Sequence, residues 1–186
     1  MLNLKRNIKH FLLVFVASFY SFTAVANVND RFLELLDYEV QNRALAYEMM
    51  ADFAESESPG GKKQFWRAYS QLEVLNQKVY SPIAAKYQLP MEQTLVTNIT
   101  RWLGEVTYHL FPETWMEMIH GDTVIYVGDL KEMKRLSDPI DSSFFQYVVD
   151  QEIVQAQAME LVIKGRAGQG AKLIEEFLSE NTFAKN

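Results

Sequence analysis

Carboxylate side chains with a second potential ligand three residues later are the features of this sequence that suggest chemistry. Glu117 is followed by His120 in a Glu-x-x-His motif, whereas Glu73 and Glu152 are followed by amides at the same spacing. Residues three apart share one face of a helix, so both members of each pair can point at one site. Carboxylates and histidines on facing helices bind iron or manganese, and metal binding is therefore the first chemistry to consider.

Glu152 stands out because it belongs to residues 142–164, a stretch without Gly or Pro that predicts one long buried helix. It lies at the centre of the apolar stripe of this helix, and Gln155 lies one turn further on. The stripe consists of Phe145, Val148, Val149, Ala156, Met159 and Ile163. An isolated buried charge is too costly, so we expect Glu152 to be paired, metal-bound or protonated. If the carboxylates do not share a metal, its expected partners are Arg43, a tyrosine or amide on a facing helix, or a proton.

Helix phase indicates which other polar residues can join Glu152 in the interior. Asn76 lies well inside the apolar stripe of the helix that begins near residue 62, and Glu73 lies at the edge of that stripe. Glu39 lies about 100° from the centre of the stripe of the first helix, at its border. We therefore predict that Glu152, Gln155 and Asn76 are buried polar residues.

The histidines are less well placed for metal binding. Glu117 and His120 fall opposite the apolar stripe of their helix, so this Glu-x-x-His pair is expected to face solvent. His109 lies on the stripe of residues 91–110, four residues after Glu105. That spacing fits a proton relay or half of a metal site, but a histidine at the edge of the core, oriented by a neighbouring acid, is the favoured interpretation.

Apolar residues recur at helical spacing after residue 27 and predict an all-α, up-and-down bundle of about five to six helices. The predicted helices span about residues 31–55, 62–88, 91–110, 112–136 and 142–164, and a short amphipathic helix follows the glycine-rich stretch 165–170. Ser81-Pro82 predicts a kink or a restart in the second helix. The β-branched run 123–127 suits a short strand, but nothing else in the mature chain alternates with period two to pair with it, so helix is the favoured interpretation. Residues 27–186 are expected to form a single domain.

The first 26 residues have the pattern of a cleaved signal peptide. Basic residues precede an apolar run over residues 11–22, and small residues then lead to a cleavage position after Ala26. A short membrane anchor is the alternative, but the apolar run is short for a bilayer, and we expect no stable membrane span after cleavage. The remaining 15 Lys and Arg against 24 Asp and Glu give a mature charge of −9. This acidity argues against binding nucleic acid.

The layout of glutamates resembles the ferritin-like and rubrerythrin-like bundles across residues 31–165. Glu39 is followed 34 residues later by Glu73, and Glu117 and Glu152 follow on later helices. The resemblance implies two metal ions held by a Glu on one helix and a Glu-x-x-His on the next, twice over. Asn76 and Gln155 stand where that pattern has histidines, so the motifs are degenerate. The candidate metal ligands implied are Glu39, Glu73, Glu152, His109 and His120.

The pattern of residues favours an exported, periplasmic or secreted, non-catalytic helical domain that binds a protein partner or a small ligand, such as an envelope accessory or stress factor. No complete catalytic set is present: the chain has no cysteine and no Gly-x-Ser-x-Gly motif, and we expect no cofactor. The alternative is a metal-binding ferritin-like bundle with redox or metal-storage activity, using iron or manganese on Glu39, Glu73 and Glu152.

Overall fold

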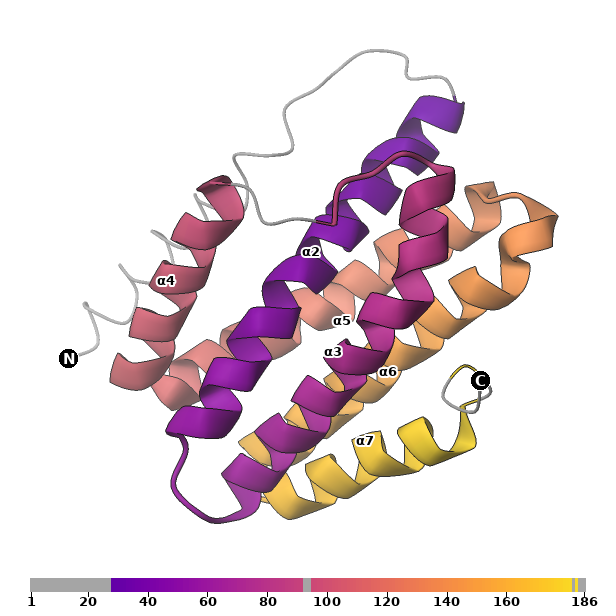
Figure 1. The fold of residues 1–186 in the computed structure, drawn as a ribbon. Coiled ribbons are helices and arrows are strands. Elements are labelled where there is room, and N and C mark those ends of the chain that lie inside the picture. Colours follow the sequence, from indigo (N-terminus) through magenta and orange to yellow (C-terminus); the bar gives the residue numbers. More distant parts are fainter. Residues whose placement is uncertain (1–27, 92–94, 182, 184–186) are drawn as a thin grey trace.

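The computed structural model describes residues 28–91, 95–181 and 183, and these residues form an all-α helical bundle, as the sequence predicted (Figure 1). The described part contains six α-helices and one 3-10 turn. The helices are α2 (Val28–Ser56), α3 (Gly61–Lys86), α4 (Leu95–Leu110), α5 (Pro112–Leu136), α6 (Ser142–Ile163) and α7 (Ala167–Glu180), with the turn η1 at Pro139–Asp141. The predicted signal peptide lies outside the described residues.

Two helical hairpins, α2–α3 and α5–α6, make up the bundle. Arg31 and Glu132 form an ion pair at one end of it, and the rings of Phe53 and Trp115 meet at the other, so α2 runs antiparallel to α5. Helix α4 connects the hairpins from outside the bundle and packs on α2 and α5 (Figure 1). Helix α7 closes the opposite side, where it packs on α3 and α6. Within the described residues, no helix combines the length and apolar character needed to cross a bilayer.

The helix boundaries follow from turn residues in the sequence. Gly60, with φ +155°, precedes α3, and Gly165, with φ +74°, follows α6, and both conformations favour glycine. Pro112 begins α5, where its missing N–H costs nothing. Helix α3 continues through Pro82 without the predicted restart. Residues 123–127 lie inside α5, which confirms the favoured helical interpretation over the short strand.

The interior contains two hydrophobic clusters, one toward each end of the bundle. The first is rich in aromatic residues, with Phe53, Phe65, Trp66, Tyr108 and Trp115 at its centre. The second includes Phe32, Leu36, Leu130, Met133, Phe145 and Val148. Every bundle helix contributes to both clusters, so their burial holds the two hairpins together.

Helix α4 presents to solvent the face that the sequence predicted to be buried. Trp102, Val106 and His109 point outward and are exposed. Tyr108 and the polar residue Arg101 instead determine which side of α4 meets the bundle. Tyr108 enters the first hydrophobic cluster, and Arg101 forms ion pairs with two acidic side chains of α2. An amphipathic stripe identifies the apolar side of a helix but does not show whether anything covers it.

Candidate functional site

The four helices of the bundle place polar side chains between the two hydrophobic clusters, and we call this group the buried polar cluster. It consists of Glu39 and Arg43 on α2, Tyr69, Glu73, Asn76 and Tyr80 on α3, Tyr126 on α5, and Tyr147, Gln151, Glu152 and Gln155 on α6. All of them are buried. Because buried polar groups are costly unless they are paired, this cluster is the part of the interior that most needs an explanation.

Arg43 lies at the centre of the cluster, surrounded by three carboxylates from three helices. Its Nη1 is 2.8 Å from Glu73 Oε1, its Nη2 is 3.3 Å from Glu152 Oε2, and its Nε is 3.3 Å from Glu39 Oε1. The planar guanidinium has donors on three sides, which suits it to contact several acids at once. Arg43 thus links α2 to α3 and α6.

Helical spacing explains how each element contributes to this arrangement. Glu39 and Arg43 are four residues apart on α2, so they lie on adjacent turns of one face. On α3, the cluster residues Tyr69, Glu73, Asn76 and Tyr80 follow one another at intervals of three or four. That face of α3 is therefore polar in the middle of the bundle and apolar toward both ends.

The carboxylate of Glu39 is satisfied chiefly by tyrosines. Its Oε1 accepts a hydrogen bond from the Tyr80 hydroxyl at 2.5 Å, and its Oε2 accepts one from Tyr126 at 2.7 Å. Helix phase predicted Glu39 at the border of its stripe, whereas it is fully buried. The prediction was wrong because it took no account of Tyr80 and Tyr126 on facing helices, which supply the donors that make burial tolerable.

Amides connect α3 to α6 on the other side of the cluster. Asn76 Nδ2 donates to Glu73 Oε2 at 3.0 Å and to Gln151 Oε1 at 2.9 Å. Asn76 Oδ1 accepts from the Tyr147 hydroxyl at 2.6 Å, and Gln151 Nε2 donates to Tyr80 at 3.0 Å. An amide has both donors and acceptors, so these side chains can join carboxylates to hydroxyls in one continuous network.

Gln155 lies beside Glu152 and Arg43, and its amide can take either of two orientations. In one, its oxygen accepts from the Tyr69 hydroxyl at 2.7 Å. With the amide turned over, the nitrogen donates to Glu152 Oε2 at 3.2 Å and the oxygen accepts from Arg43 Nη1 at 3.0 Å. The first orientation also lets Gln155 Nε2 donate to Gln151 Oε1 at 3.1 Å, whereas the second places the Gln155 oxygen against this same acceptor unless the Gln151 amide turns over as well.

Burial changes the protonation of this cluster. Removal from water raises the pKa of Glu152 to about 8, even though Arg43 opposes the shift, and the nearby Glu39 and Glu73 raise it further. The pKa of Glu73 is also raised, again chiefly by burial. Burial alone would lower the pKa of Arg43, but the three carboxylates raise it well above its usual value. Glu152 is therefore mostly neutral at pH 7, while Arg43 stays charged.

The expected metal ligands are only partly brought together. Glu39, Glu73 and Glu152 converge, but the Arg43 guanidinium lies within 3.3 Å of each of them and provides the positive charge at their centre. Within the described residues, no group of three or more His, Asp or Glu side chains is arranged to hold a metal ion. The donor set with Arg43 in place therefore does not fit a di-metal centre of the ferritin-like type.

The histidines lie outside the buried polar cluster. His109 is exposed on α4, and the neighbouring Glu105 pairs with Arg101 at 2.8 Å instead. Glu117 is exposed and His120 is partly exposed on α5. Neither histidine takes part in the hydrogen-bond network around Arg43.

Sequence reasoning missed Gln151 and the four tyrosines of the buried polar cluster, which are Tyr69, Tyr80, Tyr126 and Tyr147. Arg43 was one of several expected partners for Glu152, but nothing indicated that it would contact three acids. A Glu–Arg pair four residues apart usually lies on a solvated face, so Glu39 and Arg43 gave no signal of burial. The spacing of Tyr69, Glu73, Asn76 and Tyr80 on one face of α3 is a signal that could have identified two of these tyrosines.

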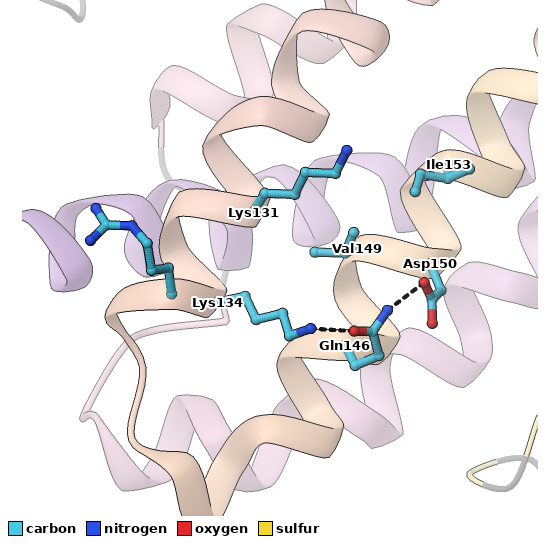
Figure 2. Close-up of a pocket in the computed structure, with 7 residues that line it drawn as sticks. Lys131, Lys134, Gln146, Val149, Asp150 and Ile153 are labelled. Carbon is cyan, nitrogen blue, oxygen red and sulfur yellow. Dashed lines mark hydrogen bonds between the residues drawn. The ribbon is translucent and has the colours of Figure 1, made fainter.

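A surface groove between α5 and α6 is the second feature that we considered as a site. Its volume is about 430 Å³, and it is lined by Lys131, Lys134, Arg135, Gln146, Val149, Asp150 and Ile153. In Figure 2, Lys134 reaches from α5 to Gln146, whose amide donates to Asp150 at 2.6 Å. The groove is basic, unlike the chain as a whole, whose formal net charge is −6.

The buried polar cluster has the character of a structural element rather than of a reaction centre. Its charged members are at most 2% exposed, so a substrate has no direct access to them. Burial raises the pKa of Tyr69, Tyr80 and Tyr126 well above the usual value, which keeps these hydroxyls protonated and weakly nucleophilic. Comparison of the chain with protein-family models, curated proteins and solved structures finds no match.

Proposed function

We propose that this protein is an exported, non-catalytic helical domain that binds a partner protein through the outward face of α4. The observation that carries the proposal is the apolar row formed by Trp102, Val106 and Leu110, which the structure leaves uncovered. Soluble proteins seldom leave large apolar side chains exposed side by side, and contiguous ones mark interaction sites. The proposal that the chain is exported depends on the predicted signal peptide in residues 1–26.

The three residues form one continuous surface on α4. They are spaced four residues apart, so they lie above one another on successive turns. Trp102 is 61% exposed, Val106 38% and Leu110 65%. With a rise of 1.5 Å per residue, the row is about 12 Å long, which suits the apolar stripe of a short helix.

Acidic side chains next to this row indicate the charge of the partner. Arg101 is shared by Glu48, Asp52 and Glu105, so one cation faces three carboxylates. The junction of α2 and α4 therefore has a local excess of negative charge, in a domain that is acidic overall. A partner helix with an apolar stripe flanked by Lys or Arg complements both features, and attraction between opposite charges favours its association.

The buried polar cluster supports a binding role because it stabilises the scaffold and leaves no reactive group accessible. Hydrogen bonds and ion pairs from Arg43, Glu73 and Tyr126 join different helices of the bundle and restrict their relative positions. Helix α4 packs on α2 and α5, which both take part in the network, and its apolar row is therefore held on a rigid support.

Trp102 provides a direct test of the proposal. The other two tryptophans, Trp66 and Trp115, are buried, so changes in fluorescence caused by binding at the surface come mainly from Trp102. The probe is a synthetic amphipathic helix with leucine on one face and lysine on the other. We expect a blue shift, protection from acrylamide quenching and saturation of the signal, because the ring becomes covered.

Matched variants make this experiment specific. Leu110→Asp should abolish the response, whereas Ile140→Asp should preserve it, because Ile140 is 80% exposed but lies beyond α5, away from α4. A Leu–Glu helix of the same length should bind much more weakly. An unchanged emission, or equal binding of the lysine and glutamate probes, would contradict the proposal.

A further inference from the structure

The exposed face of α5 carries a row of residues whose charge reverses from one end to the other. The row follows helical spacing of three and four and contains Glu113, Glu117, Gly121, Val124, Gly128, Lys131 and Arg135, all of them exposed. Acids occupy its first part, small and apolar residues its middle, and bases its last part. This order differs from an ordinary solvated face, on which both signs are mixed.

The charged residues of the row are placed symmetrically about Val124. Glu117 and Lys131 are each seven residues from it, and Glu113 and Arg135 are each eleven residues from it. If a second copy of α5 lies antiparallel across a two-fold axis at Val124, Glu117 faces the partner's Lys131 and Glu113 faces the partner's Arg135. A two-fold interface requires such a self-complementary surface.

The charged residues of the row have few partners within the chain. Among the described residues, no ion pair involves Glu113, Glu117 or Lys131, and Arg135 approaches Glu132 only at 3.9 Å. Long charged side chains at a protein surface gain little from such loose pairs. These groups are therefore able to pair with a second molecule.

The middle of the row is apolar and flat. Val124 is 53% exposed, and Gly121 and Gly128 lie on either side of it inside a helix, where glycine is destabilising relative to alanine. A methyl group added to either glycine would meet nothing within 4 Å, so packing inside the molecule does not require them. They lower the surface around Val124, which allows another helix to approach closely.

Two hollows border the charged ends of the row, one between α5 and α6 and one that residues of α3 and α4 also line. Lys131 and Arg135 line the groove of about 430 Å³ seen in Figure 2, and Glu113 and Glu117 line a second one of about 310 Å³. The first hollow stays basic despite Asp150 in its lining, and the second stays acidic despite Lys62. The antiparallel arrangement brings the acidic end of one copy to the basic groove of the other.

From this symmetry we infer that two copies of this chain associate through α5, antiparallel about a two-fold axis at Val124. The row on α5 shares no residue with the apolar row of α4, so this inference does not depend on the proposed partner-binding face. Because ion pairs at its two ends contribute to association, the dimer weakens as the salt concentration rises.

Charge reversal tests this arrangement on the mature full chain by sedimentation equilibrium. Glu117→Lys and Lys131→Glu each place like charges opposite one another, and we expect each to weaken the dimer by about tenfold or more. The double variant restores opposite charges in the same register, so its dimer should be close to wild type in strength. Lys172→Glu on α7, whose side chain is also exposed, serves as the control and should leave the dimer unchanged.

A cysteine test locates the axis independently, because the chain contains no cysteine of its own. Val124→Cys should give a disulfide-linked dimer under mild oxidation, whereas Val74→Cys on α3, at a residue with similar exposure, should not. A chain that stays monomeric at millimolar concentration overturns the inference. A dimer that is unchanged by both single charge reversals also overturns it. A double variant that fails to recover the dimer does the same, and is the result expected if another protein is the partner of this face.

Discussion

Arg43 Nη1 and Glu73 Oε1 lie 2.8 Å apart in the interior of the bundle, and this pair joins α2 and α3 at the centre of the fold. Arg43 also contacts the carboxylates of Glu39 and Glu152, each at 3.3 Å. Removing one member of a buried ion network destabilises the fold much more than replacing the whole network with apolar residues. The charges that remain then have neither water nor an ionic partner. The consequences can be measured by substituting individual members.

Arg43→Leu should be the most destabilising single change in the cluster. It leaves three buried carboxyls without their cation, and we expect a loss of about 3–5 kcal/mol in the free energy of unfolding. The loss should be smaller at acidic pH, where the carboxyls are protonated. Urea denaturation at pH 5 and pH 8 measures both effects, and a loss below about 1 kcal/mol at pH 8 would contradict a central role for Arg43.

Glu152→Gln should be tolerated at neutral pH and should stabilise the protein above it. Burial raises the pKa of Glu152 from 4.5 in the unfolded chain to about 8 in the folded one. The folded state therefore binds more protons between these values, and its stability falls as pH rises from about 5 to 8. The glutamine variant lacks this titration, so its melting temperature should change less over that range. The raised pKa of Glu73 also makes stability fall as pH rises, and this contribution remains in the Glu152→Gln variant.

Metal should not stabilise the wild-type protein, because the Arg43 guanidinium already lies between the three carboxylates. We expect less than one equivalent of iron, manganese or zinc after reconstitution, and no change in melting temperature with manganese. Arg43→Ala removes the guanidinium and leaves Glu39, Glu73 and Glu152 facing one another, so manganese should raise the melting temperature of this variant. Stoichiometric metal in the wild type would instead support the ferritin-like alternative.

Arg101→Met should loosen α4 without unfolding the bundle. Its ion pairs with Glu48 and Asp52 are partly exposed, and such pairs contribute only about 0.2–1 kcal/mol each. The melting temperature should therefore fall only slightly. Hydrogen exchange should accelerate in α4 but not in α3 or α6, since local opening requires less free energy than global unfolding. Uniform acceleration in all helices would show that α4 is not a separate unit.

The helices themselves were predictable, because each has its own apolar periodicity and its own stop signals. The stripe around Glu152 identified α6 as a central helix, and Pro112 and Gly165 lie at boundaries that the structure confirms. The orientation of α4 was not predictable. Its apolar row suggested burial, but Arg101 and Tyr108 set the contact with the bundle, and those interactions depend on residues more than 40 positions away.

The buried polar cluster was predictable only in part for a similar reason. The burial of Glu152 could be predicted from the sequence of its own helix, because its neighbours on the stripe are apolar. The convergence of Glu39, Glu73 and Glu152 on Arg43 depends on how three helices are aligned along their axes. Periodicity within one helix contains no information on that alignment.

The position of the polar cluster between two hydrophobic clusters has a consequence for how the helices select their register. Apolar side chains interdigitate in several ways, and a helix displaced by one turn, about 5.4 Å, would still bury much of its apolar surface. The same displacement of α3 would take Glu73 away from Arg43 and leave both charges unpaired inside the protein. The buried polar cluster therefore sets the axial alignment of the helices. Packings in which a helix is shifted along the bundle axis are destabilised by unpaired buried charges, even where the apolar side chains could still pack.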